Sequence, residues 1–148
     1  MADRAQGVGM SPLLTAHKHY GSLLLVLILA VIVVALTKGP KTVLQRIVTV
    51  LVDINLVVGI AALFYTAKPI SWFHPIFALG AVGLLHAASK SEDKAKVVRC
   101  FSLALVLLVA AWSVNAPWGP SFFKDEKTGQ PILPIKSVPA AIQPAAVK

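Results

Sequence analysis

Four long apolar runs constrain the fold of this chain more than any other feature of its sequence. The runs are 15 to 21 residues long and cover residues 21–36, 47–67, 72–88 and 100–114. A helix rises about 1.5 Å per residue, so about 20 residues cross the roughly 30 Å hydrocarbon layer of a bilayer. Each run reaches this length with its flanking residues. A water-soluble bundle would need a polar face on every helix, which these runs lack, so the chain is predicted to span a membrane.

The order of residues within the runs predicts helices rather than barrel strands. The backbone of a membrane-spanning segment must satisfy its own hydrogen bonds, as only a helix or a closed barrel does. Barrel strands alternate apolar and polar residues, whereas residues 23–29 are all apolar. We therefore predict an all-α membrane protein, a four-transmembrane-helix up-down bundle over residues 20–115. The predicted helices cover residues 20–37, 46–67, 72–89 and 97–115, after a flexible lead over residues 1–19.

The last part of the chain, residues 116–148, has a different character. It holds six of the ten prolines. Proline removes a backbone donor and is excluded from helix interiors, so we predict an extended, partly polyproline tail. Such a segment has no core of its own and should become ordered only against another surface. We expect a partner in a larger assembly to supply that surface.

The basic residues predict an orientation in the membrane. A net charge of +8 could indicate nucleic-acid binding in a soluble protein, but in a membrane protein Lys and Arg collect in cytoplasmic loops. Connections 38–46 and 90–99 are basic, whereas 68–71 carries only Lys68. We therefore predict no nucleic-acid partner, a location in the cell inner (cytoplasmic) membrane and both termini outside the cytoplasm. Aromatic residues, which favour the headgroup level, then lie at the outer helix ends: Tyr20, Phe64, Tyr65, Trp72, Phe73, Trp112 and Trp118.

Three histidines are predicted at one depth near the outer surface. His17 and His19 precede the first predicted helix, and His74 opens the third. Two imidazoles that face each other across a bundle form a b-type haem site, with His19 and His74 as the candidate axial ligands. The three histidines together could instead hold copper or zinc as a metal site. In a third interpretation they are ordinary amphipathic residues at the headgroup boundary.

Asp53 and His86 are predicted to form a structural polar pair. His86 follows His74 by 12 residues, about 18 Å along a helix, so one haem cannot use both. Asp53 lies at a depth comparable to that of His86, and a carboxylate in lipid is costly unless it is protonated or paired. A contact between the two would fix helix packing. The alternatives are a proton relay, or a haem, pigment or quinone contact at His86.

No enzyme constellation is evident in the sequence. It shows no Ser–His–Asp set at plausible depth, no phosphate-binding loop and no acidic metal cluster. A single cysteine, Cys100, excludes an internal disulfide and a cysteine-based metal centre. We therefore predict a non-catalytic integral membrane subunit of a larger energy-converting complex, electron-transfer or photosynthetic. Its partners would be the lipid bilayer and other membrane subunits, which its bundle and tail would stabilise. The alternatives are a b-type cytochrome-like haem-binding electron-transfer subunit and a small metal-handling or carrier protein.

Several short motifs between residues 17 and 118 carry a resemblance to a known group. They are His17-Lys18-His19-Tyr20, Gly59, His74-Pro75, His86 and Asn115-Ala116-Pro117-Trp118. In these motifs the chain resembles small bacterial four-helix membrane proteins labelled cytochrome B-like. The resemblance implies a haem or electron-transfer setting. Those proteins often carry a histidine on the second helix near the position of Asp53, so the resemblance leaves His19 and His74 as the haem candidates here.

Overall fold

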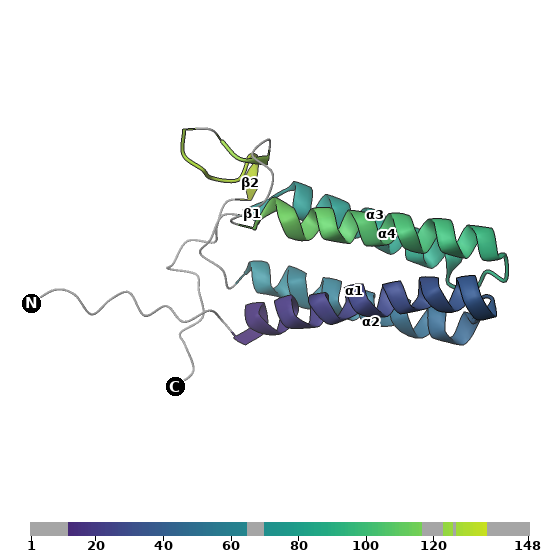
Figure 1. Ribbon diagram of the computed structural model, residues 1–148. Coiled ribbons are helices and arrows are strands. Elements are labelled where there is room, and N and C mark those ends of the chain that lie inside the picture. Colours follow the sequence, from purple (N-terminus) through teal and green to yellow (C-terminus); the bar gives the residue numbers. More distant parts are fainter. Residues whose placement is uncertain (1–11, 65–69, 117–122, 126, 136–148) are drawn as a thin grey trace, which may run out of the picture.

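Four α-helices run alternately up and down as a bundle in the computed structural model (Figure 1). The structure describes residues 12–64, 70–116, 123–125 and 127–135. The prediction of an all-α bundle is confirmed, with a two-stranded sheet added at one end. The elements are α1 (Pro12–Lys38), α2 (Thr42–Leu63), β1 (Ile70–Ser71), α3 (Phe73–Ala88), α4 (Lys94–Val114) and β2 (Pro134–Ile135).

Three of the helices are long and apolar enough to cross a membrane. These are α1, α2 and α4, with 27, 22 and 21 residues. Their apolar side chains face outward along the bundle, and Val26, Val57 and Val106 are each more than 60% exposed. Such surfaces suit contact with lipid. The chain is therefore a multi-pass membrane protein. Helix α3 is shorter, with 16 residues, or about 24 Å.

Three helices begin earlier than the sequence predicted. Helix α1 begins at Pro12 rather than near residue 20, α2 at Thr42 rather than near residue 46, and α4 at Lys94 rather than near residue 97. Proline is well accommodated in the first turn of a helix, where its missing N–H has no partner to lose. The longer α1 includes His17 and His19, which therefore have a fixed helical phase instead of lying in a flexible lead.

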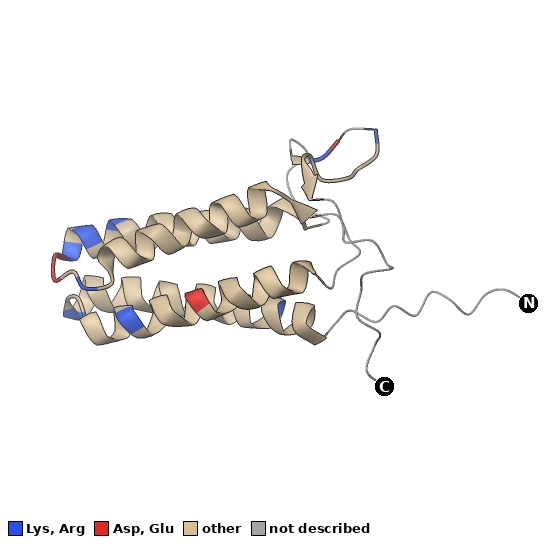
Figure 2. Cartoon of the chain, turned by 180° about the vertical axis from the view of Figure 1, so that it is seen from behind, with Lys and Arg blue, Asp and Glu red and all other residues tan. Residues whose placement is uncertain are grey.

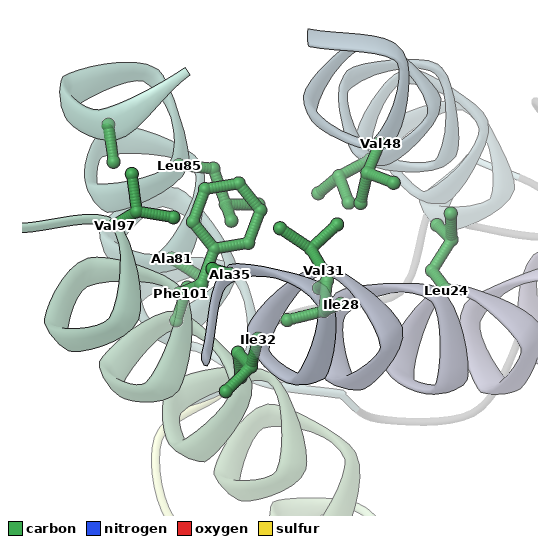
Figure 3. Close-up of a cluster of buried hydrophobic side chains, with 13 residues drawn as sticks. Leu24, Ile28, Val31, Ile32, Ala35, Val48, Ala81, Leu85, Val97 and Phe101 are labelled. Atoms are coloured by element: carbon green, nitrogen blue, oxygen red, sulfur yellow. The ribbon is translucent and has the colours of Figure 1, made fainter. Parts of the chain in front are cut away.

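The buried apolar core lies toward one end of the bundle. We call this the basic end, since connections 39–41 and 89–93 lie there and Lys and Arg gather around them (Figure 2). Phe101 is fully buried between all four helices (Figure 3). The opposite end is called the sheet end, where the buried apolar residues are small: Ala62, Ala111, Val114 and Ala116. The core cluster consists of Leu24, Ile28, Val31, Ile32, Ala35, Val48, Val52, Ala81, Leu85, Ala88, Val97, Phe101 and Ala104.

A buried amide joins α2 to the end of α3. Gln45 is fully buried, and its amide orientation follows from its neighbours. Its Nε2 donates to the carbonyl oxygens of Ala88 at 3.0 Å and Ser91 at 3.2 Å, and its Oε1 accepts from the Lys41 N–H at 3.2 Å. The sequence analysis did not single out this residue.

We predict that Gln45→Leu destabilises the bundle by about 1 to 2 kcal/mol, because three backbone groups lose a buried partner. Thermal unfolding in detergent would measure the change. Arg46→Leu, at the exposed neighbouring position, is the matched control and should leave the unfolding temperature close to that of the parent. Equal effects of the two substitutions would contradict this role for Gln45.

Part of the proline-rich tail folds back onto the sheet end. Strand β2 pairs antiparallel with β1, which sets Ile135 opposite Ile70 and Pro134 opposite Ser71. Ser71 is buried; its Oγ donates to the Ile132 carbonyl oxygen at 2.8 Å. The tail was predicted to be extended and ordered by a partner, but its described part lies on the chain's own bundle. Residues 117–122, 126 and 136–148 lie outside the described residues.

An aromatic cluster and a tight turn complete the described tail. The Phe123 ring lies 5.3 Å from that of Phe73, centroid to centroid, and 6.1 Å from that of Phe77. Beyond it, Asp125 Oδ1 accepts hydrogen bonds from the Thr128 N–H at 2.8 Å, the Thr128 hydroxyl at 2.9 Å and the Lys127 N–H at 3.1 Å. The turn is therefore built around one carboxylate.

The pKa of the Asp125 carboxyl is lowered, chiefly by the Thr128 hydroxyl and then by the Thr128 and Lys127 amides. These hydrogen bonds therefore stabilise the turn fully at pH values above about 3.9, the ordinary pKa of an aspartate. The stabilisation is lost as the pH falls through the lowered pKa of Asp125. In an NMR titration we predict that the Thr128 amide resonance shifts with a midpoint below the ordinary pKa of aspartate, and that Asp125→Asn abolishes this shift. A midpoint at the ordinary aspartate pKa would contradict the role of the Asp125 carboxylate in the turn.

Candidate functional site

Two imidazole rings face each other at the sheet end. His17 comes from α1 and His74 from the first turn of α3; their ring centroids are 6.1 Å apart and their planes are inclined by 76°. The sequence analysis paired His74 with His19 instead. His19 is exposed, because two residues along a helix turn a side chain by about 200°. The structure therefore brings His17, not His19, to His74.

Each ring is held through its Nδ1 atom by a main-chain carbonyl. The His17 Nδ1 lies 3.1 Å from the carbonyl oxygen of Asn55, and the His74 Nδ1 lies 2.7 Å from that of Ala111. A carbonyl oxygen only accepts, so Nδ1 carries the hydrogen in both rings. In a neutral ring of this tautomer the Nε2 lone pair is available to a ligand. Metal-ligating histidines are commonly oriented in this way.

The His17 ring lies directly on the backbone of α2 at Gly59. A Cβ atom at Gly59 would lie 2.6 Å from the Cε1 of His17, 3.0 Å from its Nδ1 and 3.1 Å from its Nε2. Gly59 follows Asn55 by four residues, so the two occupy one face of α2. The absence of a side chain at this position therefore lets α1 and α2 approach with an imidazole between them.

Asn55 adds a polar atom to the same site. Its side-chain Oδ1 is buried and has no hydrogen-bond partner among the described residues. A Cβ at Gly21 of α1 would lie 3.3 Å from the Asn55 Nδ2. Buried oxygens are nearly always hydrogen-bonded in proteins, so this acceptor is an exception among the described residues. The sequence analysis did not assign Asn55 to this site; its spacing of four from Gly59 within an apolar run was the available signal.

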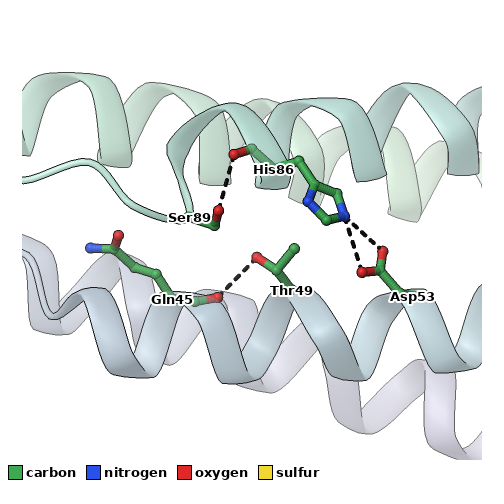
Figure 4. A network of polar contacts seen from close by, with 5 residues as sticks. All are labelled: Gln45, Thr49, Asp53, His86 and Ser89. Carbon is green, nitrogen blue, oxygen red and sulfur yellow. Dashed lines mark hydrogen bonds and ion pairs between the residues drawn. The ribbon is translucent and has the colours of Figure 1, made fainter.

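Asp53 and His86 meet closer to the basic end. The His86 Nε2 lies 3.0 Å from Asp53 Oδ2 and 3.1 Å from Oδ1 (Figure 4). The structure thus brings together the two residues that the sequence analysis paired. The His86 side chain is 55% exposed and the Asp53 side chain 35% exposed, so the pair lies on the lateral surface of the bundle. Asp53 lies eleven residues beyond Thr42, where α2 begins, or about 16 Å along the helix.

The three-histidine metal site is not assembled. Within residues 12–64, 70–116, 123–125 and 127–135, no group of three or more His, Cys, Asp or Glu side chains could hold a metal ion. His17 and His74 approach each other, but His19 points away from them because of its place on the helix. This corrects the expectation that His17, His19 and His74 could act as one copper or zinc site.

Comparison with protein-family models, curated proteins and solved structures gives no match to this chain.

Proposed function

We propose that this chain is a b-type cytochrome-like membrane subunit in which His17 and His74 would hold the iron of a haem. The observation that supports it is the pair of imidazoles from two helices, each anchored through Nδ1 to a main-chain oxygen at 3.1 Å and 2.7 Å. Both Nε2 lone pairs then remain available for iron.

The number of ligands favours haem over a bare metal ion. A haem macrocycle supplies four nitrogens of its own, so two imidazoles complete the coordination of its iron. Zinc takes four protein ligands in structural sites and three in catalytic ones. The sheet end offers two rings in contact, together with the unpartnered Asn55 oxygen and small buried residues nearby. A bound haem would supply one-electron transfer, while these residues would fix ring orientation and tautomer.

The proposed site lies toward the outer face of the membrane. We infer that α3 also crosses the bilayer, with residues 70–72 and Ser89 adding to its 16 helical residues. Basic connections favour the cytoplasmic side, which places Lys38, Lys41 and Lys90 inside and both termini outside. The haem would then exchange electrons near the outer surface, and the chain would be a subunit of an energy-converting complex.

Haem content tests the proposed function. The chain would be expressed in haem-replete cells, purified in mild detergent and assayed for b-type haem by its pyridine complex. We expect one haem per chain. Protein that is folded, as judged by its helical circular dichroism and cooperative unfolding, but contains no haem would contradict the proposal.

A second candidate function is a non-catalytic assembly subunit without a cofactor. It is favoured by the half-exposed Asp53–His86 pair on an apolar lateral surface, since a polar pair in lipid gains from a covering helix. A haem-free chain that comigrates with other membrane subunits in mild detergent would support this candidate. Recovery only as a haem-containing particle without other subunits would reject it.

A further inference from the structure

The lateral surface formed by α2 and α3 carries polar atoms where lipid is expected. Asp53 lies about 16 Å into α2, and its partner His86 is more than half exposed. Large apolar side chains surround them, including Val57 and Leu79, which are 65% and 57% exposed. We define the α2–α3 face as Val50, Asp53, Val57, Leu79, Gly83 and His86.

The mutual hydrogen bonds leave this polar pair incompletely satisfied. His86 uses its Nε2 toward Asp53, and its Nδ1 has no partner within the described part of the chain. The two carboxylate oxygens of Asp53 together offer about four acceptor positions. Unsatisfied polar groups in hydrocarbon are costly, so a surface that supplies complementary donors and acceptors would be bound.

The face is also shaped for close helix approach. Gly83 lies one turn before His86 on α3, and a Cβ built there would meet nothing within 4 Å. In membranes, small residues at a surface allow two backbones to approach and pack. At Gly59, by contrast, the corresponding space is filled by a histidine of the same chain.

We propose that a second copy of this chain docks on the α2–α3 face. Each His86, as the imidazolium, keeps its Nε2–H on Asp53 of its own chain and donates its Nδ1–H to the Asp53 carboxylate of the other copy. A two-fold axis sets residue i against residue j and residue j against residue i. The two-fold rotation sets the Asp53 of each copy against the His86 of the other. The face therefore complements a second copy of itself, and no other protein is required. The inference depends on membrane insertion of the bundle and not on haem binding.

Cysteine cross-linking in native membranes tests the dimer. Gly83→Cys would be introduced with Cys100→Ser and oxidised with copper phenanthroline, and Val106→Cys on the exposed side of α4 is the matched control. We expect a disulfide-linked dimer from Gly83→Cys and little from Val106→Cys. Equal cross-linking at both positions, no dimer at Gly83, or a cross-link at Gly83 to a different protein would each overturn the proposal.

Exchange of the two polar residues provides an independent test. Asp53→His leaves only imidazoles at the centre of the face, and His86→Asp leaves only carboxylates, so each variant alone should dimerise roughly tenfold less well than the parent. Coexpression of the two variants with different tags should restore a mixed dimer. Absence of the mixed dimer, with both variants inserted in the membrane, would overturn the pairing. If neither variant inserts, the Gly83 cross-link decides.

Discussion

Gly59→Ala is expected to destabilise the bundle by about 2 to 3 kcal/mol and to displace His17, because overpacking at a tight contact forces neighbouring groups to move. The added Cβ would lie 2.6 Å from the Cε1 of His17 and within 3.1 Å of both ring nitrogens. His17 cannot retreat without breaking its hydrogen bond to the Asn55 carbonyl oxygen. Once the His17 ring is displaced, the proposed haem should be lost or greatly depleted.

Thermal unfolding in detergent, together with haem content, measures both effects of Gly59→Ala. Val106→Ala is the control, since Val106 lies on α4 outside the α2–α3 face and is 63% exposed, and alanine favours helix. It should unfold close to the parent temperature and keep its haem. If Gly59→Ala behaved like Val106→Ala, the close contact between α2 and His17 would be refuted.

Phe101→Ala is expected to produce the largest loss of stability, about 3 to 5 kcal/mol, through the cavity it leaves in a fully packed site. Phe101 is 0% exposed and contacts the core formed by all four helices (Figure 3). In a membrane protein the lost contacts matter more than transfer from water, because lipid is as apolar as the core. Many of these variant chains should therefore fail to accumulate as folded protein.

Leu103→Ala is the control for Phe101→Ala, since Leu103 lies two residues further along α4 and is 55% exposed. It should change stability by less than about 1 kcal/mol. Denaturant unfolding in mixed micelles would compare the two. Similar losses from both substitutions would show that the cluster around Phe101 is not the centre of the core.

The apolar runs were sufficient to predict the helical bundle, because backbone hydrogen bonding in lipid leaves few other structures. Helix ends were harder to predict. Helix α1 begins at Pro12, although polar residues such as His17 and Lys18 lie in its first two turns. Composition marks the part of a helix within lipid, whereas the helix itself extends beyond it into the headgroup region.

The choice of histidine depended on that helix end. Residues before 20 were predicted to be a flexible lead, so only their depth in the membrane could be compared with that of His74. Depth does not distinguish His17 from His19. Once α1 begins at Pro12, the two side chains point to opposite sides, and His17 alone faces His74. The Asp53–His86 contact was predictable because both residues lie within helices and at comparable depth.

Long-range hydrogen bonds to backbone groups could not be predicted from the sequence. Gln45 bonds to Ala88 and Ser91 through their carbonyl oxygens, and His74 bonds to that of Ala111. Such acceptors belong to every residue type and therefore carry no sequence signal. The pairing of β1 with β2 is equally hidden, since it joins two-residue strands far apart in the chain.

A reduced-minus-oxidised absorption spectrum of four purified proteins tests the haem assignment most directly. These are the parent chain and its variants His17→Ala, His74→Ala and His19→Ala. We predict a b-type band in the parent and in His19→Ala, and its loss in His17→Ala and His74→Ala. A band that persists in both of the latter variants, or that disappears only with His19→Ala, would contradict ligation by the two facing rings.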